Sequence, residues 1–273
     1  MTPSELVTYR LEGPDRRIAV VGLNRPDKRN AINEAVIDAL RAAVHRAGDE
    51  ADVGVLYGHG KNFCAGLDLG EALARAASQT RPPRRGKRHS WHEVFDTIAR
   101  GPVPWVAALH GAVVGGGLEL ATAAHLRVAD ASAFFGLPEG QRGIFVGGGG
   151  TVRIQRVVGY TVMADMMLTG RLLSATEGER EHIVRYLVPE GQALAKAMEL
   201  AAKVAKNTHE TNWRITNVLP RINDLAHDDG LFMEYLNSNL QRSPETAERL
   251  REFVEGRAAP LVAPAMAPAP DKN

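Results

Sequence analysis

Three consecutive glycines at residues 115–117 follow an apolar strand-like run and lead directly into the apolar segment that contains Glu119. Glycine loses the most backbone freedom on folding, so a triplet weakens both strands and helices. A glycine turn that opens a helix also leaves backbone N–H groups without partners at the positive end of the helix dipole. Such groups can stabilise an oxygen atom that gains negative charge during a reaction.

A second glycine turn lies in the segment HGKNFCAGLDLG, residues 59–70, which also follows an apolar run and opens a helix. One N–H group is a weak anion site, but two from adjacent strands could bind one oxygen, each contributing roughly 3 kcal/mol to catalysis. The alternatives are a structural turn or close helix–sheet contact, and a pyrophosphate-binding turn. Pyrophosphate binding is disfavoured because residues 111–120 lack the G-x-G-x-x-G spacing and the chain has no Walker A sequence.

The elements that must position these turns follow from the spacing of apolar residues. Strands are expected at residues 17–23, 53–57, 103–109 and 126–129, with helices after the N-cap Asn33 and at 71–77 and 91–99. This alternation predicts a parallel sheet and an α/β fold, with ligands beyond the carboxyl ends of the strands. Later helices are expected at 151–158, 162–168, 192–206, 212–219, 224–236 and 244–255.

Bulk composition excludes several classes of protein. The chain has 273 residues, a formal net charge of +1 and 44% hydrophobic residues, which is typical of a globular protein and gives no reason to expect a nucleic-acid partner. Cys64 is the single cysteine, so no intrachain disulfide can form. No apolar run is long enough to cross a membrane, and the N-terminal segment lacks the apolar core of a signal peptide. We therefore expect a cytoplasmic protein with no membrane partner.

Five motifs occur in an order that resembles the crotonase superfamily, also called the enoyl-CoA hydratase/isomerase family. Each motif is moderately specific, and the ordered set, from Ile18 to Pro260, is very specific. The motifs are LNRPDKRNAIN at 23–33, NFCAGLDL at 62–69, PWVAALHGAVVGGGLELATAAHLRVAD at 104–130, AFFGLPEGQRGIFVGGGGTVRI at 133–154 and MMLTGRLLSATEG at 166–178.

The resemblance implies a crotonase-like spiral of ββα units over residues 1–200, followed by a helical C-terminal trimerisation region over 201–259. Residues 260–273 contain four prolines and are expected to form a disordered tail. By the same resemblance, the chain would form a homotrimer or a dimer of trimers and bind an acyl-CoA substrate. It would need no metal and no cofactor, since coenzyme A is part of the substrate.

Carried over by position, the oxyanion-hole donors are the backbone N–H groups of Leu67 and Gly116, and the catalytic acids are Glu119 and Glu139. In the family interpretation, Glu119 activates a water for attack on C3 and Glu139 supplies the proton to C2. The pair favours an enoyl-CoA hydratase, with reversible syn addition of water to a trans-2-enoyl-CoA. The alternatives are a hydratase-lyase or an enoyl-CoA isomerase acting on a specialised, possibly aromatic, acyl-CoA, and a non-catalytic CoA-binding scaffold.

The resemblance also implies a set of residues near coenzyme A, for which the alternative is an ordinary solvated turn. Basic side chains there suit a ligand with several phosphate charges. The expected coenzyme A-binding residues are Arg25, Lys28, Arg29, Ala31, Ala65 and Asp68.

Two further segments border the expected acyl pocket. The basic segment at residues 81–92 either recruits phosphates or is a solvated loop. Trp91 and Phe95 either line the acyl pocket or belong to the core.

The chain departs from the family pattern at two places. Val146 stands where proline is usual, and Glu181 and His182 stand where a helix-ending glycine is usual, so some local stability is expected to be lost there.

Overall fold

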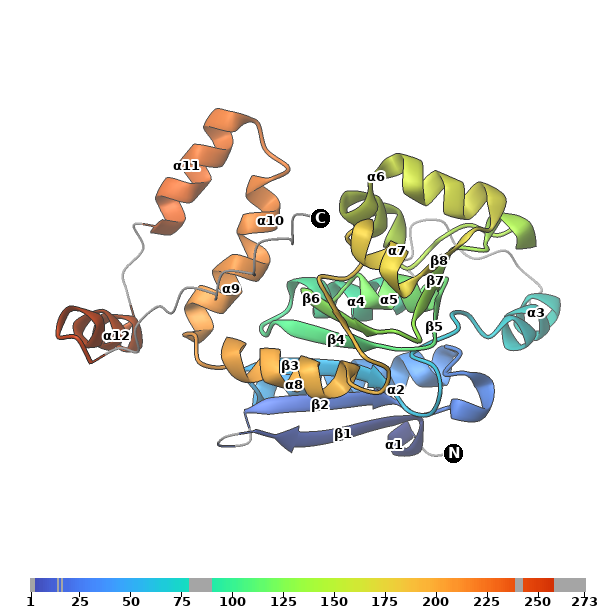
Figure 1. Ribbon diagram of the computed structural model, residues 1–273, viewed down its shortest axis with the longest axis horizontal. Coiled ribbons are helices and arrows are strands. Elements are labelled where there is room, and N and C mark those ends of the chain that lie inside the picture. Colours follow the sequence, from blue (N-terminus) through green and yellow to red (C-terminus); the bar gives the residue numbers. More distant parts are fainter. Residues whose placement is uncertain (1–2, 14, 16, 79–89, 239–242, 258–273) are drawn as a thin grey trace, which may run out of the picture.

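Two β-sheets form the centre of the molecule (Figure 1). The computed structural model describes residues 3–13, 15, 17–78, 90–238 and 243–257. The larger sheet has the strand order β1–β2–β3–β4–β6–β9, and the smaller has the order β5–β7–β8. The strands are β1 (Val7–Glu12), β2 (Ile18–Leu23), β3 (Val53–Gly58), β4 (Trp105–Leu109), β5 (Ala112–Val114), β6 (Leu126–Asp130), β7 (Phe134–Gly136), β8 (Leu172–Ser174) and β9 (Tyr186–Val188).

The chain passes repeatedly from one sheet to the other. It runs from β4 into β5 and on into α5 (Gly116–Ala121), and then from β6 into β7 and on into α6 (Gly150–Thr169). Within the larger sheet β1 pairs antiparallel with β2, and the remaining pairs are parallel. Each passage is a ββα unit, as expected for the spiral, and it brings the ends of β3, β4 and β5 to one region.

Helices cover both faces of the larger sheet. The helix α2 (Glu34–Glu50) packs on one side, and α8 (Ala193–Val204) packs on the other against β3, β4 and β6. Along β2, Val20 packs in the cluster that contains α8, and Val21 packs in the main core cluster. Strands covered on both faces are continuously apolar, which explains why the central strands can be predicted from the sequence. The Asn33 side chain accepts a hydrogen bond from the Val36 N–H, which confirms it as the N-cap of α2.

The later part of the chain is mostly helical, and its last helices project away from the sheets (Figure 1). The two helices expected at 151–158 and 162–168 form one element, α6, interrupted where Gly159 has φ 77°. The remaining helices are α1 (Pro3–Leu6), α3 (Leu69–Ser78), α4 (Ser90–Arg100), α7 (Ala175–Arg180), α9 (His209–Asn217), α10 (Leu219–Ile222), α11 (His227–Ser238) and α12 (Pro244–Val254).

Some expectations concern parts of the chain that the structure does not describe or does not test. The predicted tail at 260–273 and most of the basic segment at 81–92 lie outside the described residues. The predicted division at residue 200 falls inside α8, and it stays a prediction. None of the described helices combines the length and apolar character needed to cross a membrane.

The strands that sequence periodicity did not predict are the edge strand β1 and the short strands β5, β7, β8 and β9. Each of the short strands has three residues, which is too few to establish an alternating pattern. The strand β1 mixes polar and apolar residues, because only part of its surface is covered. Pairing with neighbouring strands, which a local window does not contain, determines these elements.

A strained residue follows α7, as the missing glycine suggested. The helix begins with a capping box between Ser174 and Glu177. After it ends, His182 adopts φ 64° and donates its N–H to the carbonyl oxygen of Glu179 at 3.1 Å. A left-handed conformation is unfavourable for a residue with a Cβ atom, and glycine adopts it without this penalty.

Replacing His182 with glycine should therefore stabilise the fold. We expect His182→Gly to raise the free energy of unfolding by about 0.5–1 kcal/mol, after allowing for the greater freedom of glycine in the unfolded chain. Urea unfolding would measure this change. The neighbouring Glu181→Gly is the matched control, since Glu181 has φ −86° and should lose stability instead. Equal effects of the two substitutions would contradict the strain at His182.

Candidate active site

Each glycine of the triplet has a different steric reason to lack a side chain. Gly115 has φ 55°, and a Cβ atom there would lie 2.8 Å from Glu139 Oε1. A Cβ atom on Gly116 would overlap the ring of Trp91, and one on Gly117 would overlap the carbonyl oxygen of Cys64. The triplet therefore serves both as a close packing point and as the lining of a cavity, described below.

The two glycine turns are joined to each other by main-chain hydrogen bonds. Cys64 donates its N–H to the carbonyl oxygen of Ala112 at 2.9 Å, and its own carbonyl accepts from the Val114 N–H at 3.1 Å. The Cys64 thiol is fully buried, and its Sγ donates to the carbonyl oxygen of Asn30. Burial raises the pKa of this thiol to about 12, so it is not a nucleophile at neutral pH. Cys64 is thus a buried filler that anchors one turn on the other.

The two predicted oxyanion donors lie on one cavity. Leu67 and Gly116 both line a cavity of about 230 Å³, and the same cavity is lined by Glu119, Glu139 and Trp91. Neither the Leu67 N–H nor the Gly116 N–H donates a hydrogen bond to any of the described residues. Two N–H groups without acceptors, next to two carboxyl groups, are what a site that stabilises an oxyanion would present.

Glu119 is held in place by the loop before α6. It lies on α5 with only 3% of its surface exposed. Its Oε1 accepts hydrogen bonds from the N–H of Gly148 at 2.6 Å and from the N–H of Gly150 at 2.9 Å. These two donors fix the orientation of the carboxyl group toward the cavity wall that it shares with Glu139. The run of four glycines at residues 147–150 therefore provides main-chain donors to Glu119.

Glu139 lies just after β7, immediately before a short 3-10 turn, Gly140–Arg142. It is 7% exposed, and its Oε2 is buried without a hydrogen-bond partner among the described residues. Burial raises the pKa of Glu139, and the nearby charge of Glu119 raises it further. A carboxyl group with a raised pKa can keep its proton and donate it.

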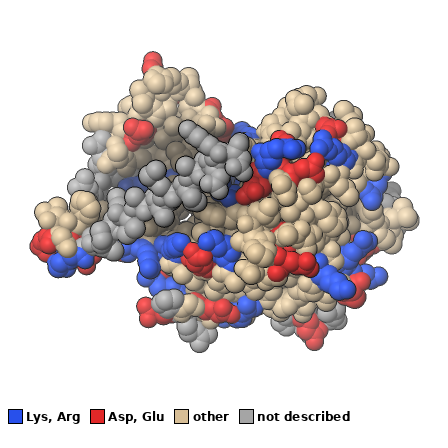
Figure 2. All heavy atoms as spheres, viewed as in Figure 1, with Lys and Arg blue, Asp and Glu red and all other residues tan. Residues whose placement is uncertain are grey.

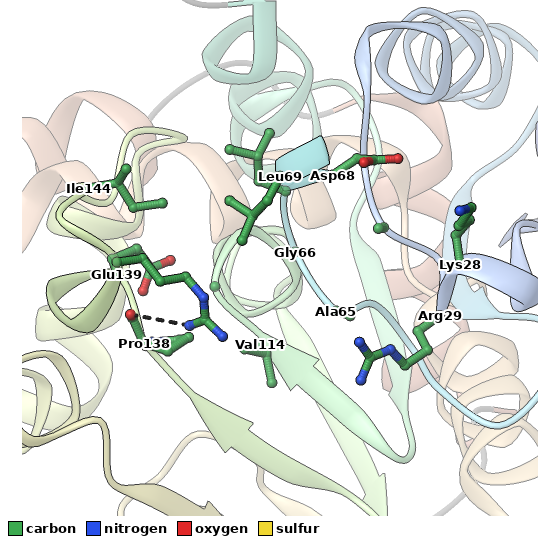
Figure 3. Close-up of a pocket in the computed structure, with 14 residues that line it drawn as sticks. Lys28, Arg29, Ala65, Gly66, Asp68, Leu69, Val114, Pro138, Glu139 and Ile144 are labelled. Atoms are coloured by element: carbon green, nitrogen blue, oxygen red, sulfur yellow. Dashed lines mark hydrogen bonds between the residues drawn. The ribbon is translucent and has the colours of Figure 1, made fainter. Parts of the chain in front are cut away.

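A second cavity, of about 250 Å³, continues from the first and shares Leu67, Glu139 and Ile144 with it. Figure 3 shows Lys28 and Arg29 on one side, Pro138 and Glu139 on the other, and the backbone of Ala65 and Gly66 between them. Of the six residues expected to bind coenzyme A, the five that line this cavity are Lys28, Arg29, Ala31, Ala65 and Asp68.

The sixth residue, Arg25, stabilises the turn instead of lining the cavity. Its guanidinium forms an ion pair with Asp68 at 3.0 Å and donates to the carbonyl oxygen of Ala31 at 2.9 Å. The Glu71 N–H donates a hydrogen bond to Asp68, and this bond lowers the pKa of the Asp68 carboxyl group. The hydrogen bond and positive charge of Arg25 lower the same pKa further. Arg25 and Asp68 therefore connect the two loops that border the cavity, and Asp68 is already paired with a cation.

Several residues of the site were not anticipated from the sequence. Asn30 is buried and donates to the carbonyl oxygens of His59 and Asn62 at 2.9 and 2.7 Å, which fixes the 25–30 turn beside the first glycine turn. Arg142 and Ile144 line the second cavity, and Phe145 lines the first. Asn30 could have been suspected because it stands in a turn where asparagine tolerates a positive φ, here 55°. The other three carry no local signal.

Trp91 and Phe95 have different roles. Trp91 lines the first cavity, whereas Phe95 is fully buried in the core.

His110 Nε2 lies 3.1 Å from the carbonyl oxygen of Gly60 and does not line either cavity. The described residues contain no group of three His, Cys, Asp or Glu side chains placed to hold a metal ion.

Comparison with known proteins establishes the family. The model of the family described as enoyl-CoA hydratase/isomerase matches residues 14–260. The chain belongs to this family. The expected crotonase superfamily is thereby confirmed, and the ββα spiral matches the fold of its solved members.

Three relatives illustrate the similarity within the enoyl-CoA hydratase/isomerase family. The enoyl-CoA hydratase EchA19 of Mycobacterium tuberculosis is 34% identical over 207 residues, covering 71% of this chain and 76% of the relative. The 2,3-dehydroadipyl-CoA hydratase of Escherichia coli K12 is 30% identical and covers 93% and 97%. A Rhodopseudomonas palustris structure with a provisional enoyl-CoA hydratase name is 43% identical, has a TM-score of 0.83 and covers 93% and 96%.

The raised pKa of Glu139 makes a prediction about stability. A carboxyl group whose pKa is higher in the folded state binds its proton more tightly there, so it stabilises the fold at low pH and loses this contribution as pH rises through its folded pKa. We therefore expect Glu139→Gln to become more stable relative to the wild type as pH rises from about 4 to 7, measured by urea unfolding.

The control is Gln155→Ala, which replaces an exposed side chain that cannot titrate. Its difference from the wild type should stay constant over the same range. A constant difference for Glu139→Gln as well would show that Glu139 is ionised with equal ease in the folded and unfolded chains.

Proposed function

We propose that the protein is an enoyl-CoA hydratase that catalyses the reversible syn addition of water to a trans-2-enoyl-CoA thioester. The observation that carries the proposal is the single cavity lined by Leu67, Gly116, Glu119 and Glu139. Membership of the family and its hydratase-named relatives support the reaction class. The chemistry needs an electrophilic thioester, one water and two carboxyl groups in different protonation states. Glu119 and Glu139 would be the two carboxyl groups.

In the proposed mechanism the thioester oxygen accepts hydrogen bonds from the N–H groups of Leu67 and Gly116, which stabilise the enolate oxygen. Glu119 accepts a proton from water as the water oxygen bonds to C3 and the C2–C3 double bond moves toward the carbonyl. Glu139 donates its proton to C2 as the enolate collapses. The step leaves Glu119 protonated and Glu139 ionised, so proton exchange with water restores the starting state.

The cavity shared with Lys28 and Arg29 would hold the coenzyme A part of the substrate. The two cations suit its phosphates, and the backbone at Ala65 would contact the adenine. Ala31 contributes to the same wall. Arg25 and Asp68 would act by keeping the two bordering loops together. The reaction as written requires no metal ion and no cofactor beyond the coenzyme A of the substrate.

Turnover of crotonyl-CoA tests the proposal. We expect the absorbance of the conjugated thioester to fall with wild-type protein, and we expect the rate to drop at least about 100-fold in Glu119→Gln and in Glu139→Gln, because each removes one proton-transfer group. Glu190→Gln, at an exposed position, is the matched control and should retain the wild-type rate.

Other outcomes would assign another activity. Turnover of bulkier enoyl-CoA substrates alone, or conversion to cleaved or isomerised products, would indicate a hydratase-lyase or an isomerase. Absence of turnover with every acyl-CoA tested would contradict an enzyme and support a scaffold that binds coenzyme A.

We also propose that the C-terminal helices form a trimer or a dimer of trimers. Large apolar side chains that would otherwise face water gather on α9, α10 and α11, which is typical of an interface. They include Trp213, Ile215, Leu219, Leu231, Phe232 and Tyr235.

Sedimentation would test the assembly. The double variant Leu231→Glu with Phe232→Glu should shift the protein toward the monomer, because it places charges where apolar contacts are expected. Leu73→Glu, at an exposed apolar position on α3, should leave the assembly unchanged. A monomeric wild-type protein would refute the proposal directly.

A further inference from the structure

A third cavity, of about 470 Å³, lies between the C-terminal helices and the body of the molecule. Its walls come from α4, residues 122–125 after α5, Arg127 of β6, the first half of α6, and the helices α9 and α10. It shares no lining residue with the two cavities of the proposed active site. Figure 2 shows Lys and Arg side chains on the described surface next to the C-terminal helices. This cavity is therefore a separate place where a ligand could bind.

The walls of this cavity carry an excess of positive charge. Its basic side chains outnumber its acidic ones, since Asp96 is the single carboxylate among the lining residues. The arginines that line it are Arg100, Arg127, Arg153, Arg156 and Arg221.

Three of these guanidinium groups have no carboxylate partner among the described residues. Arg127 donates only to the carbonyl oxygens of Ala124 and Ile183, at 2.7 and 2.5 Å. The side chains of Arg100 and Arg221 are exposed and form no hydrogen bond or ion pair within the described part of the chain. Positive charges gathered in one hollow without acids to balance them create a potential that attracts anions.

Two buried polar atoms in the same walls also lack partners. Arg153 pairs with Asp96 at 2.9 Å, but its Nε is buried without an acceptor, and His92 Nδ1 is buried without a partner among the described residues. Burial lowers the pKa of Arg127 to about 10 and lowers that of Arg153. Removing a cation from water is costly unless an opposite charge compensates for it, and an anion in this cavity would do so.

We propose that this cavity binds a small organic polyanion, with two or more negative charges on phosphate or carboxylate groups. Guanidinium groups bind both kinds of oxyanion through paired hydrogen bonds. The apolar side chains of Ala99, Val157 and Pro220 line the same cavity, so the ligand would also present a carbon skeleton. The proposal concerns a site other than the one that would hold the thioester, and it does not depend on the proposed reaction.

The cavity is connected to Glu119 through two hydrogen bonds. Arg153 donates to the carbonyl oxygen of Gly148 at 2.5 Å, and the N–H of Gly148 donates to Glu119 Oε1 at 2.6 Å. A Cβ atom on Gly149 would lie 2.5 Å from the Arg153 guanidinium, so the loop and the arginine are in close contact. A polyanion that engages Arg153 would therefore change the mobility of the loop that orients Glu119.

Calorimetric titration of the full chain with pyrophosphate and with citrate, at constant ionic strength, tests binding. We expect saturable binding of at least one probe, weakened about tenfold in Arg100→Ala and in Arg221→Ala, since each removes one charge-assisted contact. Comparison of the two probes distinguishes phosphate from carboxylate. Arg142→Ala is the matched control, because Arg142 lines the expected coenzyme A cavity.

Binding that is lost in Arg142→Ala but retained in Arg100→Ala and Arg221→Ala would place the anion in the coenzyme A cavity and overturn the proposal. Absence of binding by both probes would overturn it as well. Hydrogen exchange supplies a second measurement that requires no turnover: the amides of residues 147–150 should exchange more slowly with the bound probe. Unchanged exchange at saturation would refute the connection to Glu119.

Discussion

The contact between the two glycine turns is the constraint on which the rest of the structure depends. The turn that contains Cys64 and the turn that contains the triplet approach so closely that a Cβ atom on Gly117 would overlap a main-chain carbonyl, and one on Gly66 would lie 2.6 Å from the carbonyl oxygen of Val114. Hydrogen bonds between Cys64 and both Ala112 and Val114 maintain this spacing. The N–H groups of Leu67 and Gly116 can line one cavity because Gly66 and Gly117, at the closest approach of the two turns, have no side chains.

Much of the fold and part of the site could be predicted from the sequence. Central strands buried on both faces are continuously apolar, so they are visible in a local window. The glycines before an apolar helix indicated the turn and its free N–H groups from the residues alone, whereas Glu119 was assigned through the resemblance to a family. The spiral of ββα units required the resemblance to a family, because composition and periodicity indicate only an α/β fold. The structure agrees with both levels of inference.

The remaining features depend on contacts between distant segments. Nothing in the local sequence around Glu139 distinguishes it from an exposed loop residue, and its burial results from the packing of β7 and the following turn against the triplet. Arg25 was expected to bind coenzyme A, yet it is engaged by Asp68, which lies 43 positions later in the sequence. The arginine-lined cavity combines α4, α6 and the C-terminal helices, so no single motif could indicate it.

The burial of Cys64 has a practical consequence. The chain contains one thiol, and it lies directly beneath the contact between the two turns, hydrogen-bonded and shielded from water. A thiol reagent can reach this sulfur only when the turns separate, so the alkylation rate counts those openings. Alkylation of Cys64 therefore reports how often the two glycine turns separate, and the native sequence needs no added label for this measurement.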